Sequence, residues 1–289
     1  MEINKCYQGD TELLIKGIPE NFVDLTVTSP PYDNLRDYGN KSIWDFEKFK
    51  TIAKELYRVT KAGGIVIWVV GDATINYSET GTSFRQALYF MDVGFSLYDT
   101  MFYKKNTSGY PPSKRYEQLI EYMFVLSKGK PKTIHLLKDK PNRWAGTSNF
   151  GTRSNRQKDG SLKKRGKSIV ADYGIRSNIW EYSTGYGYSA EEECSYKHPA
   201  IFPEKLAKDH ILSWSNEGDL VFDCFAGSGT TLKMAKLLNR NFLGFEINEE
   251  YIPLINERKE QEIIAHFSNT LLSQSANAES LISVKRESA

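Results

Sequence analysis

The sequence predicts an α/β protein whose sheet is mostly parallel and covered by helices on both faces. Apolar strand-like runs alternate with amphipathic helical stretches along most of the chain, which is the pattern of successive βαβ units. No internal repeat of about 20 to 50 residues is visible, so solenoids and propellers are excluded. A length of 289 residues is sufficient for one large α/β domain with an insertion.

The period of the apolar residues predicts each element. "IVIWVVG" (65–71) is a continuous apolar run and indicates a buried strand, whereas apolar residues recur at helical spacing over 44–61, before Gly63 and Gly64. Strands are predicted at 22–28, 65–71, 95–104, 119–126, 219–225 and 242–247. Helices are predicted at 44–61, 82–92, 203–214 and 249–265, and from about residue 230.

Two stretches depart from this alternation. From about 128 to 197 the chain is rich in Gly, Ser, Asn, Lys, Arg and Tyr and has no long periodic segment, so we interpret it as an inserted subdomain. The tail at 266–289 is rich in Ser, and we expect it to fray or to form one loose helix.

Composition bears on the cellular compartment of the protein and on whether it contains disulfides or a metal site. No apolar run approaches the roughly 18 residues of a membrane span, and the N-terminus lacks the layout of a signal peptide, so we expect a cytoplasmic protein and no membrane partner. Cys6, Cys194 and Cys224 are isolated, which argues against a disulfide framework or a zinc site. We therefore expect no metal.

The net charge is only +2, but basic residues concentrate in one part of the insertion. Between 152 and 168 a single acid, Asp159, stands against seven basic residues: Arg153, Arg156, Lys158, Lys163, Lys164, Arg165 and Lys167. Two interpretations stay open, a solvated loop or a surface that contacts the phosphates of a nucleic acid.

The motif Ser29-Pro30-Pro31-Tyr32 directly follows the strand predicted at 22–28. Pro30 and Pro31 fix φ and lack an N–H, so this backbone can neither continue a sheet nor begin an ordinary helix, while its carbonyls remain acceptors. Ser29 adds a hydroxyl, and Tyr32 adds a flat ring with a polar tip. This set suits a planar group that carries an NH2, and a strand-ending turn is the alternative interpretation.

A second motif, "DCFAGSGTT" (223–231), follows a predicted strand and opens a predicted helix, where open α/β sheets bind ligands. Gly227 and Gly229 permit a tight bend and the close approach of a ligand. Glu246 ends the next predicted strand, where an acid can accept both hydroxyls of a ribose. The sequence lacks the third glycine of the dinucleotide fingerprint and the Gly-Lys of a P-loop. S-adenosylmethionine is the remaining common ligand with a ribose and no pyrophosphate, and a helix-opening turn beside a surface acid is the alternative.

Together these motifs resemble the amino-group DNA methyltransferases of restriction–modification type, which methylate cytosine N4 or adenine N6. The Pro-Pro-Tyr motif comes first, a basic insertion next and the Gly-rich motif last, which resembles the permuted β-type order of that family. The resemblance extends from Gly9 to about Ile263. It implies a class I S-adenosylmethionine-dependent methyltransferase fold that is Rossmann-like, with a mostly parallel seven-stranded sheet, a circularly permuted motif order and an inserted target recognition region.

The resemblance also implies roles for parts of the chain. Residues 1–127 would form the catalytic half, 128–197 the target recognition region, 198–265 the cofactor-binding half and 266–289 a C-terminal tail. The base to be methylated would be flipped out of double-stranded DNA. Catalytic positions would be Ser29, Pro30, Pro31 and Tyr32, with the Tyr32 ring stacked on the base. Positions that bind S-adenosylmethionine would be Asp10, Phe202, Pro203, Asp223, Phe225, Ala226, Gly227, Ser228, Gly229, Thr230 and Glu246. DNA contacts would come from Arg36, Arg153, Arg156, Lys163, Lys164 and Arg165.

The target atom stays open at this stage. In the family that the chain resembles, a Ser at the first motif position goes mostly with cytosine N4 and an Asp mostly with adenine N6, so Ser29 favours cytosine N4. A hydroxyl could also donate to cytosine N3, which a carboxylate would repel. An N-methyltransferase that acts on protein glutamine or on a small molecule is the alternative from another class. The recognition sequence, pairing into a homodimer and a cognate restriction endonuclease are not determined by the sequence.

Overall fold

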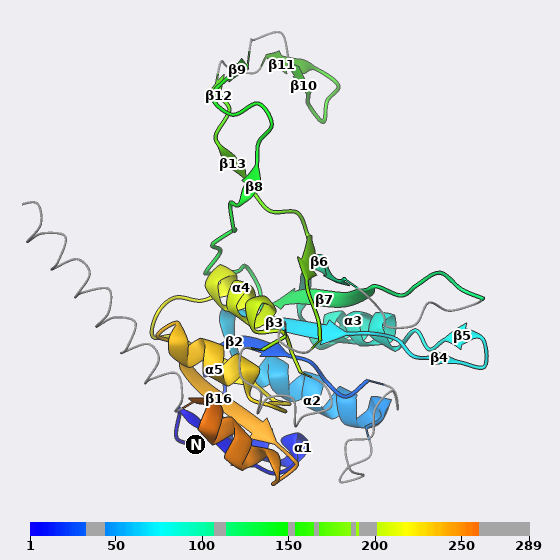
Figure 1. Ribbon diagram of the computed structural model, residues 1–289, viewed down its shortest axis with the longest axis vertical. Helices are drawn as coiled ribbons and strands as arrows, with labels where there is room; N and C mark the ends of the chain where they lie inside the picture. Colours follow the sequence, from blue (N-terminus) through cyan, green and yellow to red (C-terminus); the bar gives the residue numbers. More distant parts are fainter. Residues whose placement is uncertain are drawn as a thin grey trace, which may run out of the picture. The chain divides into compact units, whose positions relative to one another are not determined.

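The largest sheet in the part of the chain that the computed structural model describes has eight strands (Figure 1). The described residues are 1–32, 44–106, 114–149, 154–164, 168–185, 189–190 and 201–259. They fall into two units, one made of residues 1–134 and the described residues from 179 onward, the other of residues 135–178. The eight-stranded sheet belongs to the first unit.

The sheet is mostly parallel, as predicted. In spatial order its strands are β1 (Lys5–Gln8), β16 (Asn241–Glu246), β15 (Leu220–Asp223), β2 (Val23–Thr28), β3 (Thr60–Val70), β7 (Ile120–Ser127), β6 (Ser96–Lys105) and β14 (Ile179–Tyr182). The first five are parallel to one another, β7 is antiparallel to both of its neighbours, and β6 and β14 are parallel. The expected number of seven strands was too low, because β14 leaves the stretch assigned to the insertion and pairs with β6. A small hairpin, β4 (Thr74–Ile75) with β5 (Ser78–Glu79), follows β3.

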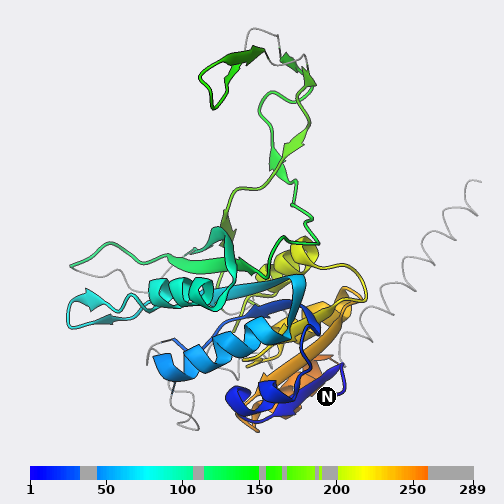
Figure 2. The same ribbon diagram turned by 180° about the vertical axis from the view of Figure 1, so that it is seen from behind.

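Helices cover both faces of this sheet (Figures 1 and 2). One layer contains α1 (Thr11–Leu14), the 3-10 helix η1 (Ile15–Gly17), α2 (Phe46–Val59) and α3 (Thr82–Val93). In the other layer α4 (Glu204–Trp214) packs against α5 (Thr230–Leu237). Residues 251–259 are also helical, residues 249 and 250 form a turn, and residues 260–265 of the predicted helix lie outside the described residues. Among the helices that are described, none has the length and apolar character needed to cross a membrane.

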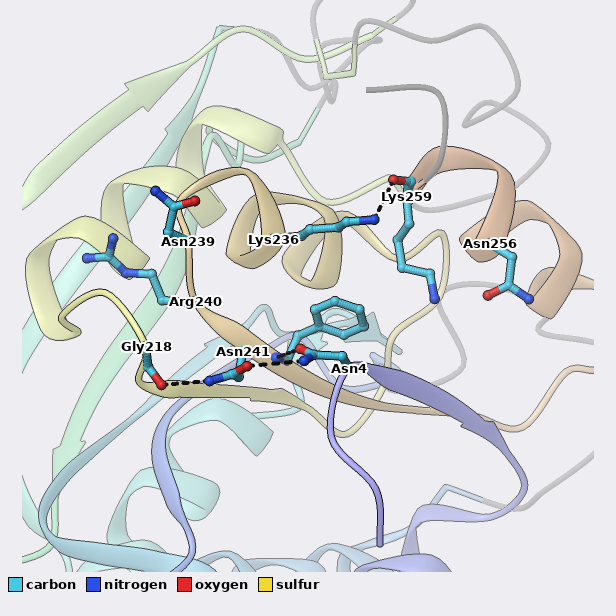
Figure 3. Close-up of a pocket in the computed structure, with 9 residues that line it drawn as sticks. Asn4, Gly218, Lys236, Asn239, Arg240, Asn241, Asn256 and Lys259 are labelled. Atoms are coloured by element: carbon cyan, nitrogen blue, oxygen red, sulfur yellow. Dashed lines mark hydrogen bonds between the residues drawn. The ribbon is translucent and has the colours of Figure 1, made fainter. Parts of the chain in front are cut away.

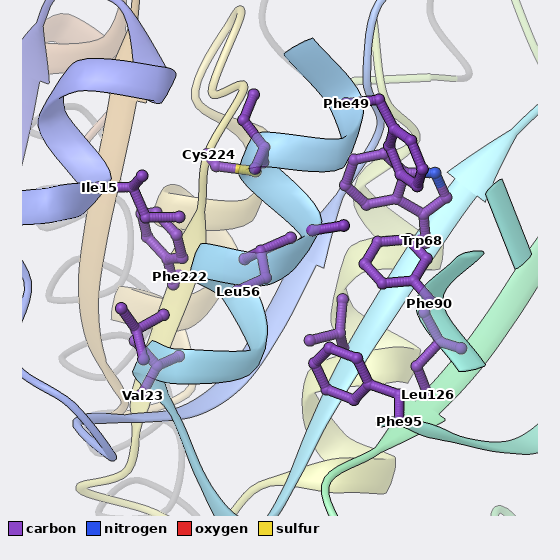
Figure 4. Close-up of a cluster of buried hydrophobic side chains, with 14 of the residues drawn as sticks. Ile15, Val23, Phe49, Leu56, Trp68, Phe90, Phe95, Leu126, Phe222 and Cys224 are labelled. Carbon is purple, nitrogen blue, oxygen red and sulfur yellow. The ribbon is translucent and has the colours of Figure 1, made fainter. Parts of the chain in front are cut away.

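Strand β3 shows why its sequence is apolar throughout. Trp68 points into the buried cluster formed with α2 and α3, where its ring centroid lies 5.7 Å from that of Phe49 and 5.1 Å from that of Phe90 (Figure 4). Successive side chains of a strand point to opposite faces of the sheet. Ile67 and Val69 therefore point to the other face, where they are fully buried as well. A central strand covered by helices on both sides has no polar face to present.

The second unit consists of short antiparallel strand pairs. They are β8 (Lys140–Pro141) with β13 (Tyr173–Gly174), β9 (Ser148–Asn149) with β12 (Ser168–Ile169), and β10 (Ser154–Arg156) with β11 (Leu162–Lys164). An ion pair between Arg176 and Asp139 adds a contact between the two ends of the unit's chain. All residues of this unit lie within the insertion predicted at 128–197, while residues 128–134 and the described residues from 179 onward are grouped with the first unit.

Candidate active site

The two sequence motifs meet at one edge of the sheet. β15 and β2 are adjacent and parallel, with Phe222 opposite Thr26, so the carboxyl ends of these two strands lie side by side. Residues 29–32 leave β2 at this edge, and residues 224–229 leave β15. In parallel α/β sheets this is the edge that binds ligands.

Asp223 joins the two motifs through buried hydrogen bonds. Its Oδ1 atom accepts from Thr28 Oγ1 at 2.6 Å and from the Phe225 backbone N–H at 3.0 Å. Burial raises the pKa of the Asp223 carboxyl from 3.8 to about 6, against the opposing effect of these hydrogen bonds. Through these contacts Asp223 holds β2 against the Gly-rich loop, and its predicted contact with the cofactor stays a prediction.

Glu246 ends β16 and is also nearly buried, with 8% of its surface exposed. Its Oε2 atom accepts from the Gly227 N–H at 2.7 Å, and its Oε1 atom accepts from the Asn248 N–H at 2.8 Å. Burial raises the pKa of the carboxyl, while the hydrogen bonds from Asn248 and Gly227 lower it. Since each carboxylate oxygen has a second lone pair, this fixed carboxylate can accept further hydrogen bonds.

Backbone conformation favours glycine at both positions of the loop, and close packing adds a second reason at Gly229. Both have positive φ, 52° at Gly227 and 78° at Gly229, a conformation that other residues rarely adopt. A Cβ on Gly229 would lie 3.0 Å from two side-chain carbons of Ile255 in the helix of residues 251–259. Bulk at Gly229 would therefore disturb the packing of that helix, so a substitution there does not test ligand approach alone.

The Pro-Pro-Tyr motif places its two hydroxyls in one chain of hydrogen bonds. Ser29 Oγ donates to Tyr32 Oη at 3.1 Å, and Tyr32 Oη donates to Glu121 Oε2 at 2.8 Å. Lys105 Nζ donates to the other oxygen of Glu121 at 2.9 Å. Neither Glu121 nor Lys105 was predicted as a site residue. Local sequence gives no signal for them, because they come from strands β7 and β6 and meet the motif only in the folded sheet.

Asp10 lies close to this edge, since the preceding Gly9 donates its N–H to the Glu246 carbonyl at 2.9 Å. The Asp10 carboxylate caps α1 by accepting from the Glu12 N–H at 3.0 Å, and it pairs with Lys48 Nζ at 2.6 Å. The other predicted cofactor positions are buried or partly buried: Phe202, Pro203, Phe225, Ala226, Ser228 and Thr230. Phe225 makes an edge contact with Trp44, the ring centroids being 5.2 Å apart.

Arg258 is a second residue that the sequence analysis missed. Its side chain is fully buried, and it donates to the Ser228 carbonyl at 2.6 Å and to Glu204 Oε1 at 2.6 Å. Lys233 Nζ donates to the same carboxylate oxygen at 2.5 Å. These bonds connect the helix of residues 251–259 with the Gly-rich loop, α4 and α5. A basic residue in a predicted helix gives no signal of burial, because arginine is mostly exposed.

Only part of the predicted DNA-binding set can be placed. Arg156 on β10 and Lys163 on β11 are exposed in the second unit, where Lys163 pairs with Asn155. The backbone of Lys164 pairs with Ser154. Three predicted positions lie outside the described residues: Arg36, Arg153 and Arg165.

A cavity of about 500 Å³ lies at the opposite edge of the sheet (Figure 3). Residues around it include Asn4, Gly218, Lys236, Arg240, Asn241 and Lys259. Asn4 precedes β1, Gly218 precedes β15 and Asn241 begins β16, whereas the motif residues follow their strands. The cavity is therefore separate from the candidate active site. Within the described ranges, no three or more His, Cys, Asp or Glu side chains are grouped so that they could hold a metal ion.

Comparison with known proteins gives the class that this fold defines. A solved structure of PvuII DNA methyltransferase (cytosine-N4-specific) matches with a TM-score of 0.65 and 23% identity, over 93% of this chain and 92% of that one. The fold is therefore that of a DNA methyltransferase, as the resemblance in the sequence implied.

Sequence comparison gives the family. The model of the N6_N4_Mtase family, described as DNA methylase, matches residues 23–257. The orphan methyltransferase M.BamHII of Bacillus amyloliquefaciens is 54% identical over 245 residues, which cover 84% of this chain and 91% of the relative. The type II methyltransferase M.HpaI of Haemophilus parainfluenzae is 30% identical over 259 residues, with coverage of 86% and 71%. The chain belongs to this family of DNA methylases.

The buried Asp223 carboxyl predicts a pH dependence of stability. Its pKa is about 6 in the folded protein and 3.8 as the ordinary value, so between these pH values the folded state binds a proton that the unfolded state does not. Relative to its value at neutral pH, the free energy of unfolding is higher by about 3 kcal/mol at most below about pH 4. This stabilisation of the folded state is lost as pH rises through about 6. Urea unfolding should therefore show the Asp223→Asn variant gaining stability over the wild type between about pH 4 and pH 7.

The matched control is Asp92→Asn, which changes an exposed carboxylate at the end of α3. Its stability difference from the wild type should stay nearly constant over the same pH range. If the difference for Asp223→Asn were equally constant, the raised pKa of Asp223 would be refuted.

The buried Arg258 predicts a large loss of stability on truncation. Arg258→Met removes a donor to the Ser228 carbonyl and leaves Glu204 with only one of its two cationic partners. Breaking a buried ion pair from one side costs about 3–5 kcal/mol. Urea unfolding of Arg258→Met should show a loss in this range, against a change of about 0.5 kcal/mol or less for the exposed neighbour Asn256→Met. Similar small losses in both variants would contradict the assignment.

Proposed function

We propose that the protein is a site-specific DNA methyltransferase that transfers a methyl group from S-adenosylmethionine to cytosine N4 of a flipped base. One observation carries the proposal: the Pro-Pro-Tyr motif after β2 and the Gly-rich loop after β15 leave neighbouring strands at the same edge, with Glu246 at the end of β16 beside them. Membership of the DNA methylase family supports DNA as the substrate.

The residues at this edge fit the ribose of S-adenosylmethionine. Glu246 is held by the N–H groups of Gly227 and Asn248, which leaves a lone pair on each oxygen for the two ribose hydroxyls. The predicted contacts from Asp10, Phe202 and the other residues of the cofactor set belong to this proposal. Bound there, the cofactor supplies a methyl group on a positively charged sulfur.

The Pro-Pro-Tyr motif fits the target amino group. Ser29 Oγ and the Pro30 carbonyl accept hydrogen bonds from the NH2, which turns the nitrogen lone pair toward the methyl donor. Pro30 and Pro31 keep these acceptors in place, so little reorganisation is needed in the transition state. The Tyr32 ring lies against the flipped base, which must leave the DNA stack to reach the site.

The choice of cytosine N4 rests on the resemblance, in which a Ser at the position of Ser29 goes mostly with that target. A hydrogen bond from Ser29 to cytosine N3 would also favour cytosine N4, but in the structure Ser29 donates its hydrogen to Tyr32. Adenine N6 is therefore the alternative within the family. An N-methyltransferase that acts on protein glutamine or on a small molecule is the alternative from another class, and it would have little use for a basic insertion.

The second unit is proposed as the core of the target recognition region, for which 128–197 was the predicted extent. Exposed cations such as Arg156 and Lys163 can neutralise phosphates of the duplex. Arg36, Arg153, Lys164 and Arg165 complete the proposed set of DNA contacts. The flanking stretches of the chain would form the catalytic and cofactor-binding halves.

Loss of the Glu246 carboxylate should weaken cofactor binding. Glu246→Gln keeps one acceptor oxygen but removes the charge that both ribose hydroxyls would meet, and a hydrogen bond to a charged group contributes about 1.5–3 kcal/mol. Calorimetry should show S-adenosylmethionine binding about 10- to 100-fold more weakly, with no such change in the exposed neighbour Glu250→Gln. Wild-type affinity in folded Glu246→Gln would remove Glu246 from the site.

The identity of the methylated atom is tested by mass spectrometry of nucleosides from DNA treated with the pure protein and S-adenosylmethionine. We expect N4-methyldeoxycytidine. A label only on deoxyadenosine would establish adenine N6 instead, and a label on carbon 5 of cytosine would refute the amino-group mechanism.

Ser29→Ala should keep cofactor affinity and lose most turnover, because it removes an acceptor that acts on the substrate in the transition state.

A further inference from the structure

A chain of hydrogen bonds leads from the Pro-Pro-Tyr motif to the start of strand β7. Its members are Ser29 Oγ, Tyr32 Oη and Glu121 Oε2, with separations of 3.1 Å and 2.8 Å. Glu121 is anchored by its position in the sheet, since β7 pairs with β3 on one side and with β6 on the other. Lys105 of β6 donates to Glu121 Oε1 and so supplies a positive charge beside the carboxylate.

The carboxylate fixes the direction of both hydroxyls. An ionised carboxylate can only accept hydrogen bonds, so Tyr32 must give its proton to Glu121. The Tyr32 oxygen then accepts the proton of Ser29, which uses its only hydrogen in this bond. The lone pairs of Ser29 that remain can only accept. A target amino group, which donates hydrogen bonds, thus meets an oxygen that has no hydrogen to oppose it.

The side chains of Tyr32 and Glu121 lie close to Gly71 and are only partly exposed to water. Gly71 follows β3, and a Cβ at this position would lie 3.5 Å from the Tyr32 ring and 3.6 Å from Glu121 Cγ. Only 18% of the Glu121 side chain and 26% of the Lys105 side chain are exposed. Partial burial strengthens hydrogen bonds to a charged acceptor, because water competes less well for it.

We infer that Ser29, Tyr32 and Glu121 form a proton relay for the methyl transfer proposed above, with Glu121 as the positioning residue at its end. The inference rests on that proposed function. It adds a route for the proton that the amine must lose, and it assigns Lys105 as the cation that holds the Glu121 carboxylate in position.

The relay balances the reaction. The amine nitrogen forms a bond to the methyl carbon as the S–C bond breaks, and the electron pair of that bond stays on sulfur. The nitrogen then carries one proton in excess. This proton passes to Ser29 Oγ while the proton of Ser29 passes to Tyr32 Oη and that of Tyr32 passes to Glu121, which becomes a neutral carboxyl. Release of this proton to water restores the carboxylate.

Glu121→Gln tests the relay, because an amide has nearly the shape of the carboxylate but accepts a proton poorly. We expect the single-turnover rate of methyl transfer to DNA to fall roughly 100-fold, and S-adenosylmethionine affinity, measured by calorimetry, to stay within about twofold. The solvent isotope effect on the single-turnover rate should change, since the proton route has changed.

A second measurement reports on the chain without any turnover. In protein labelled with 13C at tyrosine Cζ, the signal that disappears in Tyr32→Phe should shift in Glu121→Gln. The matched control is Glu181→Gln, because Glu181 of β14 pairs with Lys104 of β6 at 3.0 Å but is more exposed and lies outside the chain of hydrogen bonds. Neither the Tyr32 signal nor the rate should change in that control.

The outcomes separate this inference from the proposed function. A wild-type rate in Glu121→Gln overturns the relay while leaving the methyltransferase in place. Loss of rate together with loss of cofactor affinity also overturns it, because Glu121 would then have a general structural role. If the wild-type protein methylates no amino group of DNA, the proposed function itself fails.

Discussion

The parallel pairing of β15 with β2 is the constraint on which the rest of the site depends. It brings together two motifs that are far apart along the chain, and the hydrogen bond from Thr28 to Asp223, 195 residues apart, closes the junction at 2.6 Å. Because Asp223 also accepts from the Phe225 N–H, the start of the Gly-rich loop is tied to the end of β2. A displacement of either motif would therefore move the other, so the pairing would keep the proposed methyl donor and the target base aligned.

Buried charge organises the layer behind the Gly-rich loop. Glu204, Lys233 and Arg258 are all nearly inaccessible, and their bonds join elements that the chain order keeps apart. Taking such groups out of water is costly, so this cluster is stable only with each partner in place. The loop that faces the proposed cofactor is thus supported by buried ion pairs, which require accurate geometry. The pair of Lys105 and Glu121, in contrast, is partly exposed, so Glu121 can exchange a proton with water.

Much of the fold could be predicted from the sequence. The strand at 65–71 and the helix at 44–61 depend on local periodicity, and both were found, as β3 and α2, within a few residues of the predicted limits. β1 and β14 were not predicted as strands. Each has only four residues, and β14 alternates exposed and buried positions, so their strand character comes from pairing with β16 and β6 rather than from an apolar run.

By itself the sequence determined the two motifs, their order and the acid at Glu246, because these depend on residue types at fixed spacing after strands. Only the tertiary structure decided how the polar side chains are used. Tyr32 follows β2, and it meets Glu121 of β7, 89 residues away, because only β3 lies between β2 and β7 in the sheet. Arg258 reaches Ser228 because a later helix packs on the loop. Local sequence sets which groups can donate or accept hydrogen bonds, but the partner of a buried group is chosen by the order of strands and the packing of helices, which involve the whole chain.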